Sequence, residues 1–259
     1  MNKRKMRMVA LVVAIGLSST AQAELQGRDL NGSIDSFEAY YDTDLNITWL
    51  ADANYAQTSG YDSSGAMDWA NSNLWAANLS LTDGISIYDN WRLPTVNPVN
   101  GISFNYTTSY IGSTDQGYNS SEQGTAYAGS TGSEMAHLFY NTLNNKGYCD
   151  PVLSTEDSCS GWQEGWGLTN TGPFANIQAN GYWSESEGAP NTGGAWVFFF
   201  NHGFQQNAGL KNSYLYAWAV SDGDVGIAAV PEPETYAMML AGLGLVGFMA
   251  RRRRKTETA

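Results

Sequence analysis

The strongest strand pattern of the chain lies in AWVFFFNHGFQQNAGLKNSYLYAWAVSDGD, residues Ala195–Asp224. At its start, Ala195–Phe200 places large apolar side chains on both faces of an extended chain, which is typical of a strand at the centre of a sheet. Tyr214–Val220 alternates large and small residues and predicts a second strand, with Asn201–Gly209 as a long hairpin connection. Ile47–Leu50 predicts a third strand.

Two helices are predicted upstream of this stretch. Gly65–Leu79 has apolar residues at helical spacing, with Ser64 as its N-cap. Ser133–Asn145 carries a stronger apolar stripe, and Thr131 with Glu134 matches a capping box at its start.

The chain between its two ends is expected to form one domain over residues 24–224, because about two hundred residues suit a single core. Trp, Tyr and Gly are abundant, with 9, 15 and 28 copies. This composition favours a loop-rich α+β domain with short antiparallel strands and two helices. Asn97–Gly132 has few aliphatic residues and is expected to be a polar surface insertion. Val225–Ala229 is expected to be a short linker.

The C-terminal end is a membrane-directed element that reads VPEPETYAMMLAGLGLVGFMARRRRK, Val230–Lys255. Its apolar run Thr235–Ala250 has no charged residue, and as a helix it reaches roughly 24 Å, short of the roughly 30 Å bilayer core. From shape alone, a plain C-terminal membrane anchor stays open. The flanks of the run are defined by Val230, Pro231, Glu232 and Pro233 before it and by Arg251, Arg252, Arg253 and Arg254 after it.

This order of a Pro-Glu-Pro motif, an apolar helix over 235–250 and an arginine cluster resembles the PEP-CTERM sorting signal of bacteria. The resemblance covers residues 230–255. It implies an exosortase as processing partner, contact with the membrane through the apolar helix before processing, and removal of the tail. It also implies export through the inner membrane to the cell surface, the outer envelope or the extracellular matrix.

The N-terminus agrees with export. Four basic residues precede an apolar run, Met8–Leu17, and Ala21-Gln22-Ala23 forms a small-x-small cleavage site. The pattern predicts a signal peptide over residues 1–23 and a mature chain that starts at Glu24. An uncleaved N-terminal anchor is the alternative, although a ten-residue core is short for a spanning helix.

Without these two ends the protein is strongly acidic. Residues 24–229 hold four basic and 22 acidic residues, hence a formal net charge of −18, compared with −12 for the whole chain. Such a surface repels nucleic acid and anionic lipid. The four remaining basic residues, each of which we expect to have a defined role, are Arg28, Arg92, Lys146 and Lys211.

The chain has two cysteines, Cys149 and Cys159. In an exported protein we expect them to form a disulfide that closes a short surface loop. The alternative is a catalytic or copper-binding pair, which the lack of a neighbouring histidine cluster disfavours.

Trp91-Arg92-Leu93-Pro94 places an arginine between two large apolar residues and ahead of a proline that favours extended backbone. We interpret Arg92 as a structural cation in a bidentate pair with a carboxylate. The functional alternative is contact with an anionic ligand. Lys211, which follows a glycine-bearing turn, is a second candidate structural cation.

Tyr182-Trp183-Ser184 offers a serine that could be read as a nucleophile. Catalysis would also need a base and an orienting acid. His137 lies in a predicted helix and His202 in a predicted turn, and neither belongs to a known nucleophile motif. We therefore interpret Ser184 as a strand residue whose hydroxyl satisfies backbone groups.

Any metal site predicted from the sequence would use oxygen ligands. No His/Cys spacing suggests zinc, and no EF-hand loop is present in the sequence. The weak candidates for a structural calcium site are Asp115, Asn119, Glu122, Asp222 and Asp224. Beyond this calcium we expect no cofactor.

Four segments together resemble the Lcl C-terminal-domain family of exported bacterial proteins: DLNITWLADANYA (Asp44–Ala56), NWRLPT (Asn90–Thr95), YWSESE (Tyr182–Glu187) and the opening stretch. The resemblance spans about Asp42–Gly223. It implies a C-type-lectin-like fold, distantly related to formylglycine-generating enzymes, and no catalytic residues. Ser221 stands where family members often carry Arg.

The same resemblance marks a set of residues as architectural. In the adhesin that gives the family its name the domain binds sulfated polysaccharide, which the charge of −18 opposes here. The implied structural positions are Trp91, Arg92, Leu93, Pro94, Tyr182, Trp183, Ser184, Trp196, Gly203 and Lys211.

These observations predict an exported, non-enzymatic protein of the cell envelope or extracellular matrix, associated with exopolysaccharide or biofilm. Tyr, Trp and Asn side chains on loops can stack on neutral sugars and hydrogen-bond to them. One alternative is a structural surface protein with no specific ligand. Another is an enzyme of the formylglycine-generating type.

Overall fold

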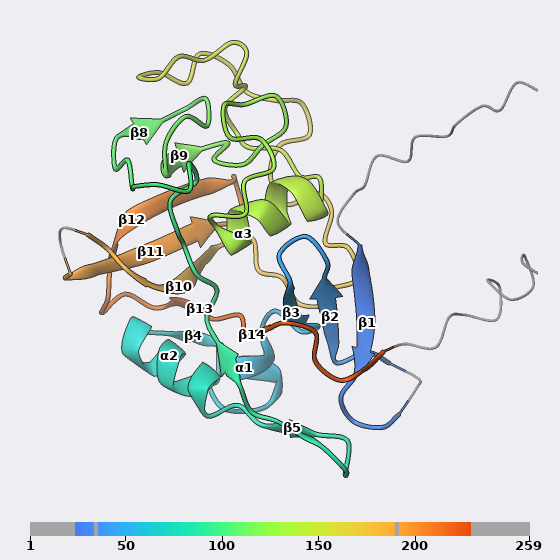
Figure 1. Cartoon of the computed structure of the whole chain (residues 1–259). Helices are drawn as coiled ribbons and strands as arrows, with labels where there is room; N and C mark the ends of the chain where they lie inside the picture. The colour runs from blue at the N-terminus through green and yellow to red at the C-terminus, as the bar shows by residue number, and fades with distance from the viewer. Residues whose placement is uncertain (1–23, 34–35, 190–191, 229–259) are drawn as a thin grey trace, which may run out of the picture.

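The computed structural model describes residues 24–33, 36–189 and 192–228. The predicted signal peptide 1–23 and the sorting tail 230–255 lie outside the described residues. Two sheets stand beside each other, with helix α3 across the space between them (Figure 1). Within the described residues, no helix is long and apolar enough to cross a membrane.

The first sheet joins the two ends of the domain. Its strand order is β15-β1-β2-β3-β14-β7, and all its pairs are antiparallel. The predicted strand Ile47–Leu50 is confirmed as β3. Val225–Ala229 is not a simple linker, because Ile227 and Ala228 form β15 and pair with Asp29 and Arg28. The strands are β15 (Ile227–Ala228), β1 (Leu25–Asp29), β2 (Ala39–Asp42), β3 (Ile47–Leu50), β14 (Val220–Asp222) and β7 (Trp91–Arg92).

The second sheet is built around the opening stretch of the sequence. Its order is β4-β13-β10-β11-β12-β9-β8, with parallel pairs only at β10–β13 and β8–β9 among the described strands. The central position predicted for Ala195–Phe200 is confirmed, because β11 lies between β10 and β12. The strands are β4 (Ala66–Met67), β13 (Leu215–Tyr216), β10 (Gly181–Glu187), β11 (Gly194–Phe199), β12 (Phe204–Leu210), β9 (Gln116–Tyr118) and β8 (Thr108–Ser109).

Two predictions for the opening stretch are wrong. Asn201–Gly209 is not a long connection, because the chain turns tightly and returns as β12 from Phe204. Gln205, a polar residue in this strand, is buried and donates to the Asp115 carbonyl oxygen at 2.7 Å. Tyr214–Val220 is not one strand either. It splits into β13 and β14 in different sheets, and Trp218 at the crossing donates from Nε1 to the Leu50 carbonyl oxygen at 2.7 Å.

The helices are shorter than predicted. The first is α2 (Trp69–Ala77), whose N-cap is Asp68 and not Ser64, because the Asp68 carboxylate accepts from the Asn71 backbone N–H at 2.8 Å. The preceding residues 66–67 pair in β4 instead. A further single-turn helix, α1 (Tyr55–Thr58), was not predicted. The hairpin β5 (Leu81–Thr82) and β6 (Ile87–Tyr88) projects from the lower side of Figure 1.

The second predicted helix begins as α3 (Glu134–His137) and continues as a π-helical turn, Leu138–Thr142. The predicted capping box of Thr131 and Glu134 is wrong. Ser133 caps the helix through the Ala136 N–H, and the Glu134 carboxylate binds Arg92 instead.

The core between the sheets is aromatic. Trp49 and Trp218 lie 5.0 Å apart between ring centroids, and Phe174 packs edge-on to Trp218 at 5.0 Å. Tyr182 and Phe200 join the same cluster from the second sheet. Large aromatic rings give much buried apolar area per residue, which suits a domain with short strands and many loops.

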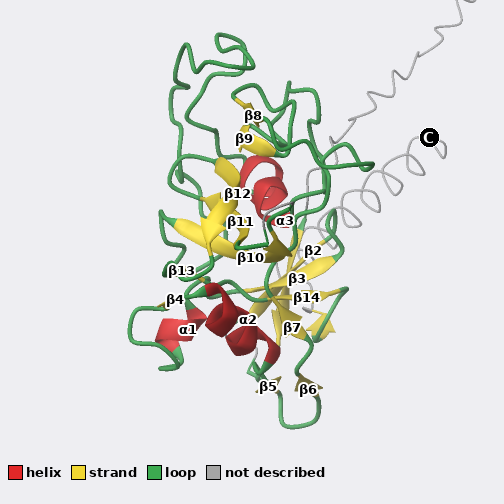
Figure 2. Cartoon of the chain, turned by 90° about the vertical axis from the view of Figure 1, so that its left-hand side faces the viewer, coloured by secondary structure: helices red, strands yellow, loops and turns green. Residues whose placement is uncertain are grey.

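Asn97–Gly132, expected to be a surface insertion, is partly integrated into the fold. It supplies β8 and β9 to the edge of the second sheet, and Phe104 stacks on the buried Trp196 at 5.5 Å. Together with residues 146–168 it forms a loop-rich region at the β8–β9 end of the molecule, here called the loop lobe (Figure 2).

Candidate functional site

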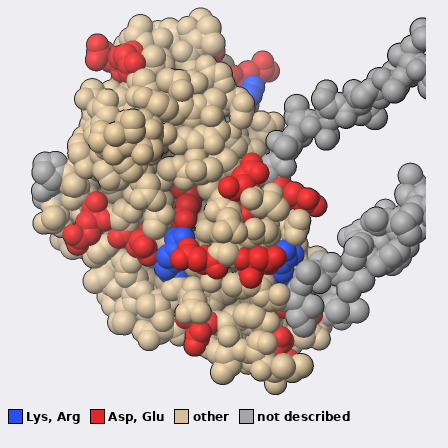
Figure 3. All heavy atoms as spheres, in the orientation of Figure 1, with Lys and Arg blue, Asp and Glu red and all other residues tan. Residues whose placement is uncertain are grey.

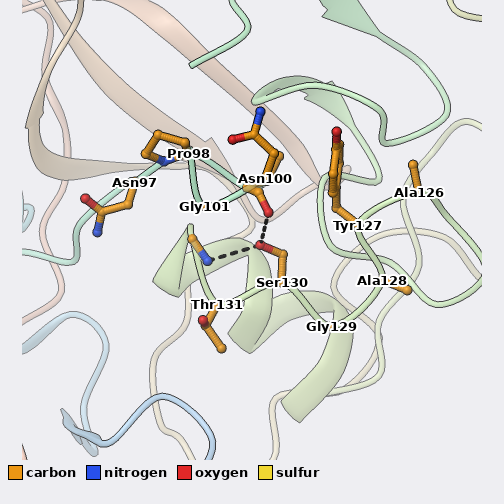
Figure 4. Close-up of a pocket in the computed structure, with 12 residues that line it drawn as sticks. Asn97, Pro98, Asn100, Gly101, Ala126, Tyr127, Ala128, Gly129, Ser130 and Thr131 are labelled. Carbon is orange, nitrogen blue, oxygen red and sulfur yellow. Dashed lines mark hydrogen bonds between the residues drawn. The ribbon is translucent and has the colours of Figure 1, made fainter. Parts of the chain in front are cut away.

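A polar hollow opens on the loop lobe between two backbone loops. It has a volume of about 660 Å³ and is bordered by residues 97–101 and 126–132. Figure 4 shows Asn100 on the first loop and the ring of Tyr127 on the second, with Ser130 between the loops. None of the residues that border it carries a charge. The hollow therefore offers amide, hydroxyl and backbone groups beside one aromatic ring.

Hydrogen bonds hold the two loops of the hollow together. The Ser130 hydroxyl donates to the Val99 carbonyl oxygen at 2.8 Å and accepts from the Gly132 N–H at 3.2 Å. The Asn97 N–H donates to the Gly132 carbonyl oxygen at 2.6 Å. These bonds fix the width of the hollow without using the side chain of Tyr127.

Asp115 anchors the first loop from below. It is fully buried, and its two carboxylate oxygens accept from the Val99 N–H at 2.7 Å and from the Asn105 N–H at 2.6 Å. Burial raises the pKa of Asp115, and these two hydrogen bonds partly oppose the shift. The Asp115 carboxylate thus accepts from backbone N–H groups and holds the first loop of the hollow in place.

A second feature of the loop lobe is a pair of exposed tryptophans. Trp162 is 65% and Trp166 is 40% exposed, whereas six of the nine tryptophans are buried and Trp69 is partly buried. Both follow the predicted disulfide Cys149–Cys159, which is confirmed. Since the chain has two cysteines and they are bonded to each other, neither is a free thiol.

Glu122 lies beneath this region. It is 7% exposed, and its Oε2 accepts from the Gly147 N–H at 3.3 Å. Burial raises the pKa of Glu122 to about 7, although Gln163, the Gly147 hydrogen bond and nearby Lys146 oppose the rise. Burial also lowers the pKa of His202, so its imidazole is neutral over a wider pH range.

Among the described residues, three of the four basic side chains are neutralised by carboxylates. Arg92 forms the predicted bidentate pair with Glu134, with two hydrogen bonds of 2.8 Å, and a further bond to Asp222 at 2.5 Å. Burial by itself would lower the pKa of Arg92, but these carboxylates raise it above its ordinary value. The equivalent contacts elsewhere are Arg28–Asp224 at 2.5 Å and Lys211–Glu187 at 2.5 Å.

Figure 3 shows the consequence for the surface. Basic atoms on this face are flanked by acidic ones, whereas the lobe over β8 and β9 is largely free of charged side chains. Lys211 also lies 4.1 Å from the ring centroid of Trp69, so its position is structural. The sequence interpretation of Arg92 and Lys211 as structural cations agrees with these contacts.

Most of the other residues that the Lcl resemblance marks as architectural lie in the core. Ser184 is buried in β10, and its hydroxyl accepts from the Ser186 N–H at 3.1 Å, as expected for a structural strand residue. Gly203 turns the chain between β11 and β12 with a φ of +72°. The buried members of the set are Trp91, Leu93, Pro94, Tyr182, Trp183, Ser184, Trp196 and Gly203.

The candidate metal ligands are not brought together. Asp222 and Asp224 bind Arg92 and Arg28, while Asp115 and Glu122 accept from backbone N–H groups in the lobe. Asn119 donates from Nδ2 to the carbonyl oxygens of Tyr110 and Cys149, both at 2.9 Å, and so joins two loops. In the described part of the chain, no group of three or more His, Cys, Asp or Glu side chains could hold a metal ion. Calcium binding stays a prediction.

Sequence reasoning missed the residues that border the hollow and the two exposed tryptophans. One signal was available for the tryptophans. Gly161–Gly167 reads GWQEGWG, so each tryptophan has glycine or polar neighbours and no apolar stripe to join. Asn100 and Tyr127 lie in segments with no periodic pattern, and the hydrogen bonds that hold these segments together join residues more than 30 positions apart.

Comparison with known proteins identifies the C-terminal end. Residues 229–254 match the family model of the PEP-CTERM protein-sorting motif. The predicted sorting signal is thereby confirmed, and it implies an exported protein that is processed by an exosortase, with a cell-surface or extracellular location. No curated protein and no solved structure matches the chain.

Proposed function

We propose that the protein is a non-enzymatic module of the cell surface or extracellular matrix that binds uncharged exopolysaccharide. In this proposal the hollow of the loop lobe is the binding site, and the α+β body is a C-type-lectin-like scaffold that presents it. The sorting signal supplies the destination, because it implies delivery to the cell exterior.

The observation that carries the proposal is the lack of charge around the hollow in a strongly acidic domain. Its bordering residues are all neutral, although residues 24–229 have a formal net charge of −18. A sugar ring presents hydroxyl groups at its edge and C–H groups on its faces. Amide and hydroxyl groups can satisfy the first, and the ring of Tyr127 can stack on the second.

Electrostatics restrict the ligand class. Arg28, Arg92 and Lys211 are engaged by carboxylates, so they offer little attraction to sulfate, uronate or phosphate. A domain of net charge −18 also repels polyanions at long range. Sulfated polysaccharide and nucleic acid are therefore disfavoured.

The disulfide supports a non-enzymatic role over a copper-dependent enzyme of the formylglycine-generating type. Cys149 and Cys159 are bonded to each other, so neither thiolate is free to bind metal or to act as a nucleophile. A purely structural surface protein without a ligand is the remaining rival.

The test is co-sedimentation of the purified domain with the host's own exopolysaccharide, together with an array of neutral, cationic and sulfated glycans. We expect retention on uncharged glycans, and a loss of about tenfold in affinity for Tyr127→Ala. Tyr214→Ala is the matched control, because Tyr214 is 73% exposed and lies outside the hollow. Absence of retention on all neutral and cationic glycans would favour the structural protein and refute the binding proposal.

A further inference from the structure

We propose a second glycan-binding surface on the loop lobe, formed by a row of aromatic rings that is separate from the hollow. The row consists of Tyr110, Tyr118, Tyr148 and Trp166, which come from four different segments of the loop lobe. Trp162 is exposed in the same loop as Trp166. None of these residues borders the hollow.

The rings follow one another at short, regular intervals. Tyr110 stacks on Tyr118 at 5.9 Å between centroids, Tyr118 contacts Tyr148 at 6.2 Å, and Tyr148 meets Trp166 edge-on at 4.9 Å. The three tyrosines are half-buried, and Trp166 is 40% exposed. Tyr110 lies against Tyr118, and Tyr148 meets Trp166 at 90°, so the tyrosines support one another and Trp166. The exposed indoles of Trp162 and Trp166 are therefore the surfaces on which units of an extended polysaccharide can stack.

The row is held in place before any ligand binds. Phe204 supports Tyr118 edge-on at 4.8 Å, and His202 contacts the same ring at 5.6 Å. Because the supporting rings come from the turn and strand of the central sheet, Tyr118 has little freedom to move. A fixed ring loses little conformational entropy on binding, which favours affinity.

A backbone ladder fixes the tryptophan end of the row. Asp150 donates from its N–H to the Gly161 carbonyl oxygen at 2.9 Å, Gln163 to Tyr148 at 3.1 Å, and Gly167 to Lys146 at 2.9 Å. The disulfide Cys149–Cys159 closes the loop between the paired segments. The exposed Trp162 and Trp166 thus lie on a loop that backbone hydrogen bonds and the disulfide hold in place.

The charges around the row favour an uncharged ligand. Asp150, Glu156 and Glu164 lie in the same loops, with Lys146 as the cation among them. These carboxylates repel a polyanion but leave C–H–π stacking with neutral sugars unaffected. A protein partner is the rival occupant, for which the exposed Val152 and Leu153 in the same loop would also serve.

This inference rests on the proposed function, because the ligand is the same uncharged polysaccharide. It adds a site that contacts further sugar units of the polysaccharide, while the hollow binds another portion of the same polymer. Two contacts on one polymer raise the overall affinity through effective concentration. The two sites can be removed separately, since they share no residue.

The experiment compares binding of the full domain to the host's exopolysaccharide with that of three surface variants. Trp162→Ala with Trp166→Ala removes the exposed rings, and we expect a loss of about tenfold in affinity. Trp166→Phe alone keeps a ring at position 166 and leaves Trp162 in place, so this variant should retain most of the affinity. Val152→Ser with Leu153→Ser removes comparably exposed aliphatic surface from the same loop and should change affinity less than about twofold.

The outcomes separate this inference from the proposed function. If Tyr127→Ala weakens binding and the double tryptophan variant does not, the aromatic row is refuted while the proposed function stands. If the Val152/Leu153 variant loses as much affinity for the exopolysaccharide as the double tryptophan variant, stacking is refuted. Stacking is also refuted if the double tryptophan variant changes only in self-association, measured by light scattering. If the unmodified domain binds no glycan, the proposed function fails and the aromatic row fails with it. Circular dichroism of each variant controls for folding.

Discussion

Arg92 and Glu134 meet through two parallel hydrogen bonds of 2.8 Å, although 42 positions separate them in the sequence. The pair joins β7 to the start of α3, and the same carboxylate accepts from the Thr95 N–H at 2.7 Å. Since the isolated bridge between Val96 and Ser133 follows directly, this pair closes the neck of the loop that carries the hollow.

Replacing Arg92 should therefore destabilise the whole domain. Arg92→Lys keeps the charge but loses the bidentate geometry, and it leaves part of a carboxylate that is 10% exposed without a partner. We expect a loss of about 2–3 kcal/mol in the free energy of unfolding, measured by urea denaturation. Lys146→Gln is the control, because this exposed ammonium has one long contact of 3.4 Å, and its change should stay within about 0.5 kcal/mol. Equal effects of the two variants would contradict this role of Arg92.

Gly203 and Gly223 provide a matched pair of positive-φ glycines. Their φ angles are +72° and +71°, so alanine is strained at both by about 1 kcal/mol or slightly more. At Gly203 a new Cβ would also lie 2.5 Å from the Tyr140 hydroxyl, whereas at Gly223 it would meet nothing within 4 Å. We expect Gly203→Ala to cost about 3 kcal/mol in unfolding free energy and Gly223→Ala about 1 kcal/mol. Thermal and urea unfolding of both variants measure this difference, and its absence would contradict the packing described for Gly203.

Glu122 should make stability depend on pH. Its pKa rises from 4.5 to about 7 on folding, so the folded protein holds this proton more tightly than the unfolded chain does. The resulting stability is complete below about pH 4.5 and is lost as the pH rises through 7, by at most about 3 kcal/mol.

Glu122→Gln mimics the protonated carboxyl and removes this titration. We expect it to stabilise the protein at pH 8 and to change little at pH 4.5, as measured by urea unfolding across this range. Glu164→Gln, which alters an exposed carboxyl, is the control and should leave the pH profile unchanged. A profile of Glu122→Gln that parallels the unmodified protein would show that Glu122 does not cause the effect.

The disulfide should stabilise both the fold and the loop that carries Trp162 and Trp166. Cys149 and Cys159 are 10 positions apart, and closing such a loop contributes roughly 2.5–3 kcal/mol in the chain-entropy model. Cys149→Ser with Cys159→Ser should lower the free energy of unfolding by about this amount and weaken polysaccharide binding. A reducing agent should reproduce both effects in the unmodified protein and have none on the double variant.

The sequence predicts the central elements of the fold more reliably than their edges. β3 and β11 follow from short runs of buried apolar residues, which need no partner to be recognised. β12 was missed because its polar Gln205 is buried against Asp115, and that partner lies 90 positions away. Tyr214–Val220 is split because its two halves join different sheets. The alternation of large and small residues along the segment does not show which sheet each half joins.

The candidate site is harder to predict for the same reason. The hollow exists because two polar segments, 97–101 and 126–132, return to the same place. The aromatic row joins rings from Tyr110 to Trp166 through backbone pairing and a disulfide. Composition shows that such residues are plentiful, but only the tertiary structure shows which of them stay exposed.

We expect this domain to be exported, freed of its sorting tail and held in exopolysaccharide. The most direct test is the intact mass of the protein recovered from the extracellular polysaccharide fraction of its own host. We expect that chain to begin at Glu24 and to lack Thr235–Ala259, which lies after the Pro-Glu-Pro motif of the sorting signal matched over residues 229–254. A chain in that fraction that retains its complete C-terminus would contradict export with removal of the tail. Absence of the protein from that fraction in a host with active exosortase would contradict its retention in exopolysaccharide.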